Sequence, residues 1–188
     1  LLALMLAKEG FRTHVYDKRK DLRTVKLHSR KRSIGMSLSK RGKAALESVD
    51  LLSKLATQMI SKKGRGTHGI DGSVKYQLYG DGTHVLSTIN RSEINKLLIN
   101  EAENTGLATF HFGTELSGID FESQTAMFEL HSGETESVSY SYLFGADGAN
   151  SKVRETLVEA GQLSATQKKV SHSFKEITIP PSPAGESV

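Results

Sequence analysis

Two acidic residues and one arginine stand where the sequence pattern changes from one element to the next. Asp17 ends the alternating run FRTHVYDK, which predicts a short strand. Asp147 lies in the Gly-Ala-Asp-Gly of residues 145–148, between a strand-like run and a helix-like run. Arg91 opens the predicted helix NRSEINKLLINEAENTG. A carboxylate at a strand end can accept hydrogen bonds from ribose hydroxyls, and a guanidinium can bind a diphosphate, so these residues indicate a nucleotide site.

Each of these positions also has a plainer interpretation. An aspartate at a strand end is most often a turn residue. Residues 145–148 could form a strand-to-helix turn, with the helix capped by Asn150 or Ser151. Arg91 could be an ordinary surface arginine. Spacing alone leaves these alternatives open.

A second candidate site lies in the stretch 62–87, which glycines divide into short runs. Asp-Gly pairs at 71–72 and 81–82 predict turns between antiparallel strands. Arg65 and Tyr79 fall in this stretch, and a guanidinium and a phenol could together hold a carboxylate. Nothing in their spacing shows that the two side chains converge.

The elements that must position these residues follow from periodicity and capping. The run LLALMLAKEG predicts a helix that ends at Gly10. Asn90 is a good N-cap, and Glu93 follows three residues later as in a capping box. Ser39 and Asp50 are expected to cap two further helices. Strands are predicted in SVKYQLY, THVLST, LATFHF, ELSGIDF, TAMFEL, SVSYSYLFG and SHSFKEITIP.

Composition is that of a globular protein: of 188 residues, 37% are hydrophobic and 24% are charged. No run of about 18 apolar residues predicts a membrane-spanning helix in this stretch. The chain has no cysteine, which excludes disulfides and thiolate metal sites. Its seven histidines show no metal-ligand spacing, and no metal site is assigned.

The net charge of +4 comes from one basic cluster at residues 18–32, where Asp21 is the sole acid. The cluster could be a solvated loop, or it could help to hold a polyanionic ligand. Nucleic acid and anionic lipid are less favoured ligands, because the cluster lacks aromatic residues and the rest of the chain is mildly acidic. Its basic members are Lys18, Arg19, Lys20, Arg23, Lys26, Arg30, Lys31 and Arg32.

The order of elements predicts the fold class α/β, with a nucleotide-binding sheet interrupted by excursions into a second sheet. We expect a cofactor domain in two parts, residues 1–60 and 91–165. Residues 61–90 would form a β insertion of the substrate domain, and residues 166–188 would begin its sheet.

Several sequence blocks are more specific together than any one of them alone. The chain resembles the kynurenine 3-monooxygenase family of FAD-dependent aromatic hydroxylases from about Leu1 to Pro181. The blocks that carry the resemblance are VYDKR, RSIGMSLSKRGKAALESV, RGTHGIDG, LYGDGTHVLSTINRSEINKLLINEAEN, FGADGANSKVRE and FKEITIPP. The implied fold is a Rossmann-like, glutathione-reductase-type FAD-binding domain lacking its first strand, with part of an interleaved β-sheet substrate domain.

The resemblance also implies an activity. FAD, reduced by NADPH, would use O2 to hydroxylate L-kynurenine to 3-hydroxykynurenine, a step of tryptophan catabolism and NAD biosynthesis. It implies no nucleic-acid partner, and membrane attachment only through a C-terminal segment that this chain lacks. A eukaryotic parent would lie in the mitochondrial outer membrane, and any other parent in the cytoplasm. The alternatives are another FAD aromatic hydroxylase or a non-catalytic truncated paralogue.

Roles for single residues follow from the same resemblance. The residues matched to cofactor binding are Tyr16, Asp17, Lys18, Arg19, Ser37, Arg91 and Asp147. Arg65 and Tyr79 match the pair that holds the carboxylate of the amino-acid substrate. No catalytic side chain is assigned, because the cofactor carries the chemistry.

The chain also departs from the family. Gly35 stands where the family usually has asparagine, which affects flavin contacts nearby. The first strand with its glycine-rich phosphate loop is missing, as is the later Gly-Asp segment at the flavin. A parallel sheet without a central strand leaves backbone groups unpaired, at about 1–3 kcal/mol for each buried group. We therefore expect a fragment that binds FAD poorly by itself and has no activity alone.

Overall fold

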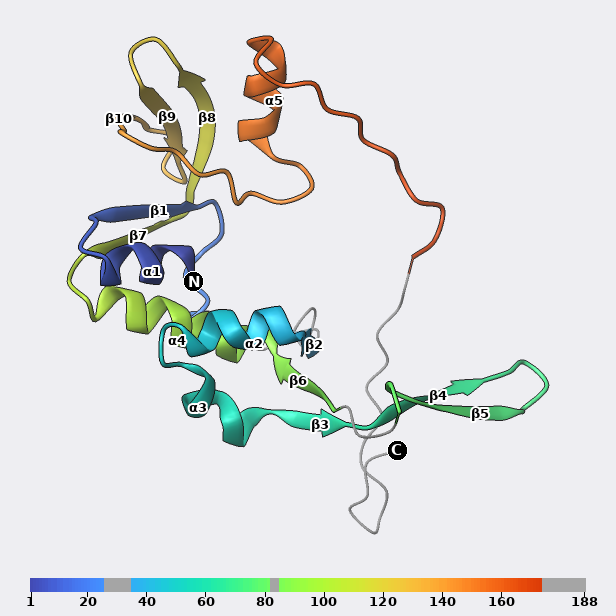
Figure 1. Ribbon diagram of the computed structural model, residues 1–188. Helices are drawn as coiled ribbons and strands as arrows, with labels where there is room; N and C mark the ends of the chain where they lie inside the picture. Colours follow the sequence, from blue (N-terminus) through green and yellow to red (C-terminus); the bar gives the residue numbers. More distant parts are fainter. Residues whose placement is uncertain (26–34, 82–84, 174–188) are drawn as a thin grey trace.

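The computed structural model describes residues 1–25, 35–81 and 85–173 (Figure 1). The chain starts with helix α1 (Leu2–Lys8), which buries Leu4 and Ala7. Gly10 follows with a φ of +88°, a left-handed conformation that suits glycine at a helix end. Strand β1 (Thr13–Asp17) comes next, so the predicted helix and the predicted strand ending at Asp17 are both confirmed.

Strand β1 pairs in parallel with β7 (Ala108–Phe112). Helix α4 (Arg91–Glu103) leads into β7, and the Asn90 side chain caps it by accepting from the Ser92 amide at 2.8 Å. Helices α1 and α4 lie together on one side of the β1–β7 pair (Figure 1). Each strand of this parallel pair follows a helix, as in a nucleotide-binding sheet, and Asp17 and Phe112 lie side by side at the strand ends.

A second sheet has the order β2 (Gly35–Leu38), β6 (Leu86–Asn90) and β3 (Ile60–Lys62), with both pairings antiparallel. Helix α2 (Lys40–Glu47) follows β2. As predicted, the Ser39 side chain caps it by accepting from the Gly42 amide at 3.2 Å.

The prediction that Asp50 caps a helix is wrong. The short helix α3 (Leu52–Leu55) follows Leu51 and has no side-chain cap; a 3-10 turn (Ala56–Gln58) extends it. The Asp50 backbone has a φ of +61°, and its carboxylate accepts from Lys8 Nζ at 2.8 Å. The Asp50 carboxylate therefore forms an ion pair with Lys8 of α1 and does not cap the helix that follows it.

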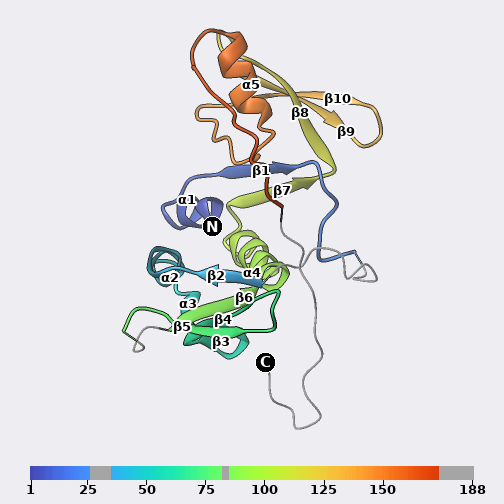
Figure 2. The ribbon, with the colours of Figure 1, turned by 90° about the vertical axis from the view of Figure 1, so that its right-hand side faces the viewer.

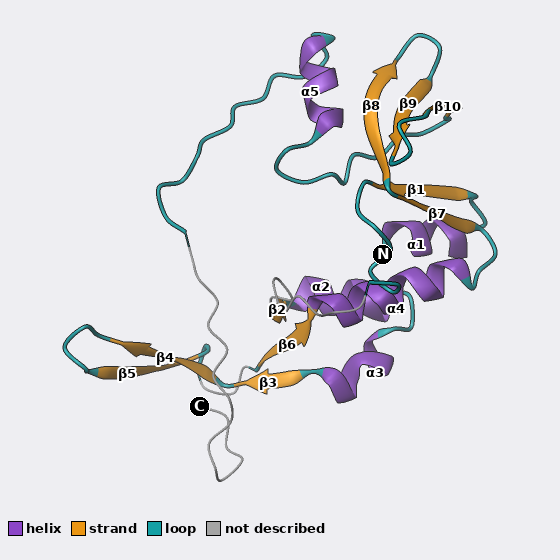
Figure 3. Cartoon of the chain, turned by 180° about the vertical axis from the view of Figure 1, so that it is seen from behind, coloured by secondary structure: helices purple, strands orange, loops and turns teal. Residues whose placement is uncertain are grey.

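Strands β4 (Gly64–His68) and β5 (Val74–Leu78) form a hairpin that extends away from the helices (Figures 1 and 3). The predicted Asp71-Gly72 turn is present: the Ser73 amide donates to Asp71 Oδ1 at 3.0 Å. The other predicted Asp-Gly turn includes residue 82 and lies partly outside the described residues.

A three-stranded antiparallel sheet occupies the opposite end of the molecule (Figure 2). It consists of β8 (Thr114–Asp120), β9 (Thr125–Leu130) and β10 (Thr135–Ser139). Helix α5 (Lys152–Glu159) lies beside β8 (Figure 2).

The predicted strand SVSYSYLFG is only half present. Strand β10 ends at Ser139, and residues 142–148 form no strand. Within the described part of the chain this stretch has no ladder partner, and Tyr142 and Phe144 are exposed. A strand needs a neighbour to take up its backbone hydrogen bonds, which sequence pattern does not reveal. The strand predicted at 171–180 lies almost wholly outside the described residues.

The main hydrophobic core lies between the helices and the first two sheets. It brings together side chains from α1, α2, α3, α4, β2, β6 and β7, so it fixes the β1–β7 pair relative to the β2–β6–β3 sheet. Its buried members are Leu4, Ala7, Leu38, Leu46, Val49, Leu51, Leu55, Ile89, Ile94, Ala102 and Ala108.

Candidate functional site

The Asp17 carboxylate, at the carboxyl end of β1, is held by Arg19. The guanidinium donates from Nε to Oδ1 at 3.0 Å and from Nη2 to Oδ2 at 2.6 Å. The Arg19 backbone amide adds a third bond to Oδ1 at 2.9 Å. The carboxylate is thus fixed in place at the strand end, where a ribose would approach it.

The same contacts keep Asp17 ionised. Partial burial acts to raise the pKa of Asp17, but hydrogen bonds from Arg19 and the charges of Arg19 and Lys18 outweigh it and lower the pKa. At neutral pH the group is therefore a pure hydrogen-bond acceptor, the form that ribose hydroxyls require.

Among the described residues, three members of the basic cluster form ion pairs with acidic residues of the chain. Lys18 Nζ lies 2.9 Å from Glu115 Oε1, and Arg19 binds Asp17. Arg23 binds Asp21 and reaches across to Glu103 of α4. These three side chains are committed to the protein itself, which weakens the interpretation of the cluster as a polyanion site. Lys26, Arg30, Lys31 and Arg32 lie outside the described residues.

Tyr16 points to the side of β1 away from the helices. Its ring stacks on His111 at 4.4 Å between centroids and on Phe128 at 4.0 Å. Both faces of the ring are therefore covered, and a contribution of Tyr16 to cofactor binding would have to come from its backbone or hydroxyl.

Asp147 caps helix α5. Its carboxylate accepts from Ser151 Oγ and from the Lys152 amide, both at 2.6 Å, and from the Val153 amide at 3.2 Å. Partial burial acts to raise the pKa of Asp147, but these hydrogen bonds outweigh it and lower the pKa. Ser151 is the N-cap, and it accepts from the Arg154 amide at 3.0 Å.

Asp147 also lies near the end of β1. The Lys18 ammonium, which is paired first with Glu115, interacts electrostatically with Asp147 and Asp17, and together these acids raise the pKa of Lys18. The structure therefore brings the two predicted acidic residues to the same side of the molecule.

Two glycines shape the turn that carries Asp147. A side chain at Gly145 would place its Cβ 2.9 Å from the Cβ of Val153, so α5 packs directly on the backbone there. Gly148 has a φ of +81°, which side-chain-bearing residues rarely adopt. Both glycines are explained by the strand-to-helix turn, whether or not a cofactor approaches.

Substitution of Gly145 by alanine is expected to lower the free energy of unfolding by about 1–3 kcal/mol, because the new methyl group overlaps Val153. The matched control is Gly42→Ala in α2, where a Cβ meets Leu38 and Ser39 at ordinary contact distances. That change is expected to stabilise the chain by about 0.5–1 kcal/mol. Urea unfolding gives the free energy of unfolding of both variants. Equal changes in Gly145→Ala and Gly42→Ala would contradict the packing argument.

The β2–β6 pairing places Ser37 on the strand next to the one that leads into Arg91. Ser37 lies opposite Thr88, and Gly35 lies opposite Asn90, the residue before Arg91. The first residue of α4 is thus at the end of the strand that carries Ser37. The two predicted motifs are therefore on neighbouring strands of one sheet, with Ser37 opposite the β6 position three residues before Arg91.

Arg65 and Tyr79 share one face of the β4–β5 hairpin. Arg65 lies opposite Gln77, whose Oε1 accepts from Arg65 Nε at 3.0 Å and from Nη2 at 2.7 Å. The Tyr79 amide extends the ladder by donating to the Lys63 carbonyl at 2.9 Å. Tyr79 is two residues from Gln77, so it is a diagonal neighbour of Arg65. This hairpin lies well away from β1 (Figure 1).

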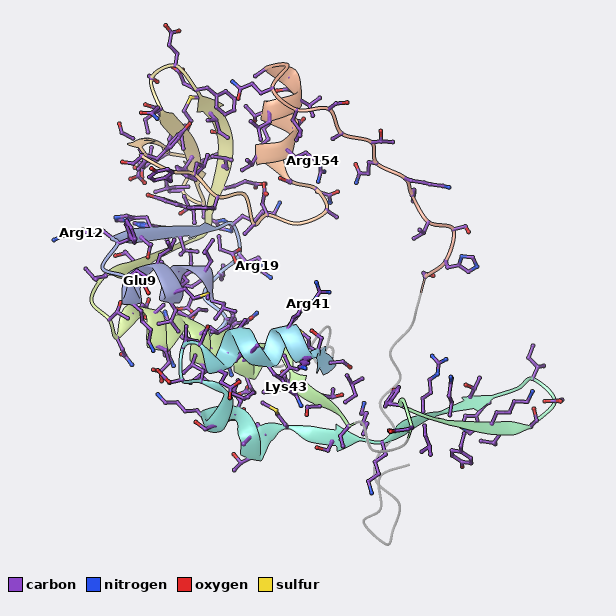
Figure 4. The ribbon with its side chains drawn as sticks, viewed as in Figure 1. Glu9, Arg12, Arg19, Arg41, Lys43 and Arg154 are labelled. Atoms are coloured by element: carbon purple, nitrogen blue, oxygen red, sulfur yellow. The ribbon has the colours of Figure 1, made fainter. Side chains whose placement is uncertain are left out.

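Two further arginines deserve a place in the candidate site. Figure 4 shows Arg19, Arg41 and Arg154 on the same side of the molecule, from the end of β1 and the starts of α2 and α5. Arg154 donates to the Ala149 carbonyl at 2.6 Å. Both missed residues stand inside blocks that carried the family resemblance, Arg41 in RSIGMSLSKRG and Arg154 in FGADGANSKVRE, so the signal was present but unassigned.

The chemistry of this side of the molecule fits a dinucleotide such as FAD. An ionised carboxylate at a strand end suits ribose hydroxyls, and guanidinium groups suit a pyrophosphate. Among the residues that the structure describes, no group of three or more His, Asp or Glu side chains could hold a metal ion. Within those same residues, no helix is both long and apolar enough to cross a bilayer.

Known proteins are similar in sequence to this chain over almost its whole length. Kynurenine 3-monooxygenase of Legionella pneumophila (strain Corby) is 36% identical over 182 residues, covering 95% of this chain and 40% of the relative. The enzyme of the same name from Stenotrophomonas maltophilia (strain K279a) is 33% identical over 187 residues, covering 98% and 41%. The chain thus spans about two fifths of the length of these relatives, and the predicted resemblance is confirmed.

Solved structures and a family match agree with the fold. The flavin-dependent monooxygenase PieE, solved in complex with FAD and substrate, superposes with a TM-score of 0.69 at 17% identity, covering 85% of this chain and 29% of PieE. That likeness confirms the predicted α/β fold class. The family described as "FAD binding domain" matches residues 1–182. The chain therefore belongs to the FAD binding domain family.

Proposed function

We propose that this chain is part of an FAD- and NADPH-dependent monooxygenase that hydroxylates L-kynurenine to 3-hydroxykynurenine. The observation that carries the proposal is the 36% identity to a kynurenine 3-monooxygenase over 95% of the chain. The ionised carboxylate of Asp17 at the end of β1 supports it, since that is where an FAD-binding sheet requires an acceptor.

Within this proposal, each group of residues has a separate task. Asp17 would accept from the adenosine ribose, with Arg19 holding the carboxylate in position. Arg91 would bind the diphosphate, and Ser37 would line the flavin from the neighbouring strand β2. Asp147 would place the start of α5 near the cofactor.

Bound FAD, reduced by NADPH, would supply the chemistry that transfers one oxygen atom from O2 to the aromatic ring. The protein would bind and orient the two reactants and keep water away from them. Residues 1–60 and 91–165 would form the cofactor domain, residues 61–90 the β insertion that faces the substrate, and residues 166–188 the start of its sheet.

The substrate assignment depends on Arg65 and Tyr79. Gln77 occupies the Nε edge of the Arg65 guanidinium, so the remaining N–H groups can donate to the substrate carboxylate. The Tyr79 hydroxyl would add a hydrogen bond from the neighbouring position on the same hairpin face.

Replacement of Arg65 by alanine is expected to weaken L-kynurenine binding roughly tenfold, the effect of losing a charge-assisted hydrogen bond. The change in affinity is measured by equilibrium titration with L-kynurenine. The protein for this experiment contains this sequence together with the remaining segments that its relatives have. The matched control is His68→Ala, on the other face of the same hairpin, which should leave binding unchanged.

The decisive assay for the proposed function is formation of 3-hydroxykynurenine that requires both NADPH and O2. NADPH oxidation by that protein without this product would favour the alternative of another FAD aromatic hydroxylase. Absence of any FAD-dependent turnover would favour the non-catalytic paralogue.

A further inference from the structure

Four rings form a column between two sheets, and we call them the aromatic column: His14, Tyr16, His111 and Phe128. His14 and Tyr16 lie on β1, His111 on β7 and Phe128 on β9. Tyr16 stacks between His111 and Phe128, and His14 Nδ1 lies 3.0 Å from His111 Nε2. The column therefore joins the β1–β7 pair to the β8–β10 sheet, and it does so beside Asp17.

The two imidazoles meet edge to edge. Their centroids are 5.3 Å apart and their planes differ by 24°. The centroid separation exceeds the 3.0 Å between the nitrogens by about the sum of the two ring radii, so the rings point at each other through these nitrogens. This is the geometry of an N–H···N hydrogen bond, in which one proton lies between two nitrogens.

We propose that the His14–His111 pair is a proton-sensing site that controls how firmly the aromatic column joins the two sheets. When His14 Nδ1 carries the bridging proton, His111 Nε2 accepts it. A single proton added to the pair can reside on an outer nitrogen, which leaves this bond intact and makes it charge-assisted. A second added proton leaves an N–H on both facing nitrogens, so two cationic rings meet edge to edge with no acceptor between them, and the pair must separate.

The charged and titratable groups around the His14–His111 pair affect how readily it takes up protons. Glu136 of β10 lies opposite Phe128, so it is on the face of that sheet that meets the column. Tyr16 is the other titratable group in the column, and burial followed by the charge of Glu136 raises the pKa of Tyr16, so it stays neutral. Glu115 of β8 is paired with Lys18.

The direction of the pH effect follows from His111. Burial, and then the neighbouring His14, lower the pKa of His111, while Glu136 partly opposes them. The folded chain therefore holds this proton less tightly than the unfolded chain, whose histidines titrate near pH about 6.5. The stabilisation is complete above that pH and is lost as the pH falls through the lowered pKa of His111.

The first test is a pH titration of the ¹⁵N-histidine-labelled chain by NMR, from about pH 8 to about pH 5. We expect the two rings to titrate as a coupled pair whose last proton is taken up below the pH at which an ordinary histidine titrates, because the pKa of His111 is lowered. Protection factors of the amides in β1 and β9, corrected for the intrinsic exchange rate at each pH, should fall by up to about tenfold per pH unit as the pH drops from about 6.5 toward the lowered pKa of His111. Independent titration of the two rings at the ordinary histidine pKa would overturn the proposal, and this test needs no variant.

The second test separates the proton from the ring. His111→Phe keeps a ring to stack on Tyr16 but has no nitrogen to titrate, and His68→Phe on the exposed β4–β5 hairpin is the matched control. The drop in melting temperature between about pH 8 and about pH 5 should shrink in His111→Phe and persist in His68→Phe. Equal drops in both variants would contradict the proposal. His14→Phe repeats the test from the other partner.

Discussion

Replacing Asp17 by alanine is expected to weaken FAD binding by on the order of 100-fold. The loss corresponds to about 3 kcal/mol, the upper end for one hydrogen bond from a ribose hydroxyl to an ionised acceptor, since the bonds from Arg19 already fill three of the roughly four acceptor positions of the carboxylate. The effect should be large because Arg19 already holds the carboxylate in place, so little ordering cost offsets the gain on binding. The change in FAD affinity is measured by flavin fluorescence titration. The protein for this experiment contains this sequence together with the remaining segments that its relatives have.

Two further variants separate this role from a general loss of structure. Asp71→Ala removes an aspartate from the β4–β5 turn, far from β1, and should not change FAD affinity. Asp17→Asn keeps the shape but not the charge, and it should fall between wild type and Asp17→Ala. Unchanged affinity in Asp17→Ala would mean that the strand end does not contact the ribose.

Leu55→Ala is expected to cause the largest loss of stability, about 2–5 kcal/mol in the free energy of unfolding. Leu55 is fully buried, and it packs in the core that joins the helices to the β2–β6–β3 sheet. Removing its methyl groups leaves a cavity that the rigid helix ends cannot close.

The control for this prediction is Leu78→Ala on the exposed hairpin, where 60% of the residue is accessible. That change should alter the free energy of unfolding by less than about 0.5 kcal/mol. Urea denaturation of both variants gives the comparison. A loss in Leu55→Ala no greater than in Leu78→Ala would show that the α3 region does not contribute to the cooperative core.

Local patterns predicted much of this fold. The strand ending at Asp17, the caps at Ser39 and Asn90, and the glycine ends of helices depend on neighbours within a few residues, and the structure has all of them. Asp50 was assigned wrongly because its partner, Lys8, is 42 residues away. Leu143 and Phe144 have a strand-like sequence, but a strand exists only where another backbone pairs with it.

The candidate site divides in the same way. Sequence blocks identified Asp17, Arg91 and Asp147, but not what the carboxylates do in the folded chain. Asp17 binds Arg19, and Asp147 caps α5. Each contact depends on the side-chain conformation in the folded chain, which residue type alone does not give. The roles assigned to Arg65 and Tyr79 remain predictions, although the hairpin register places them as neighbours.

The parallel pairing of β1 with β7 has a consequence for synthesis of the chain. His14 and His111 are 97 residues apart, so β1 emerges from the ribosome long before the strand that it must join. Until then the apolar face of α1, with Leu4 and Ala7, has no α4 to cover it. Nascent chains that end before about Phe112 should therefore bind chaperones, because α1 becomes stable only after α4 and β7 have been made.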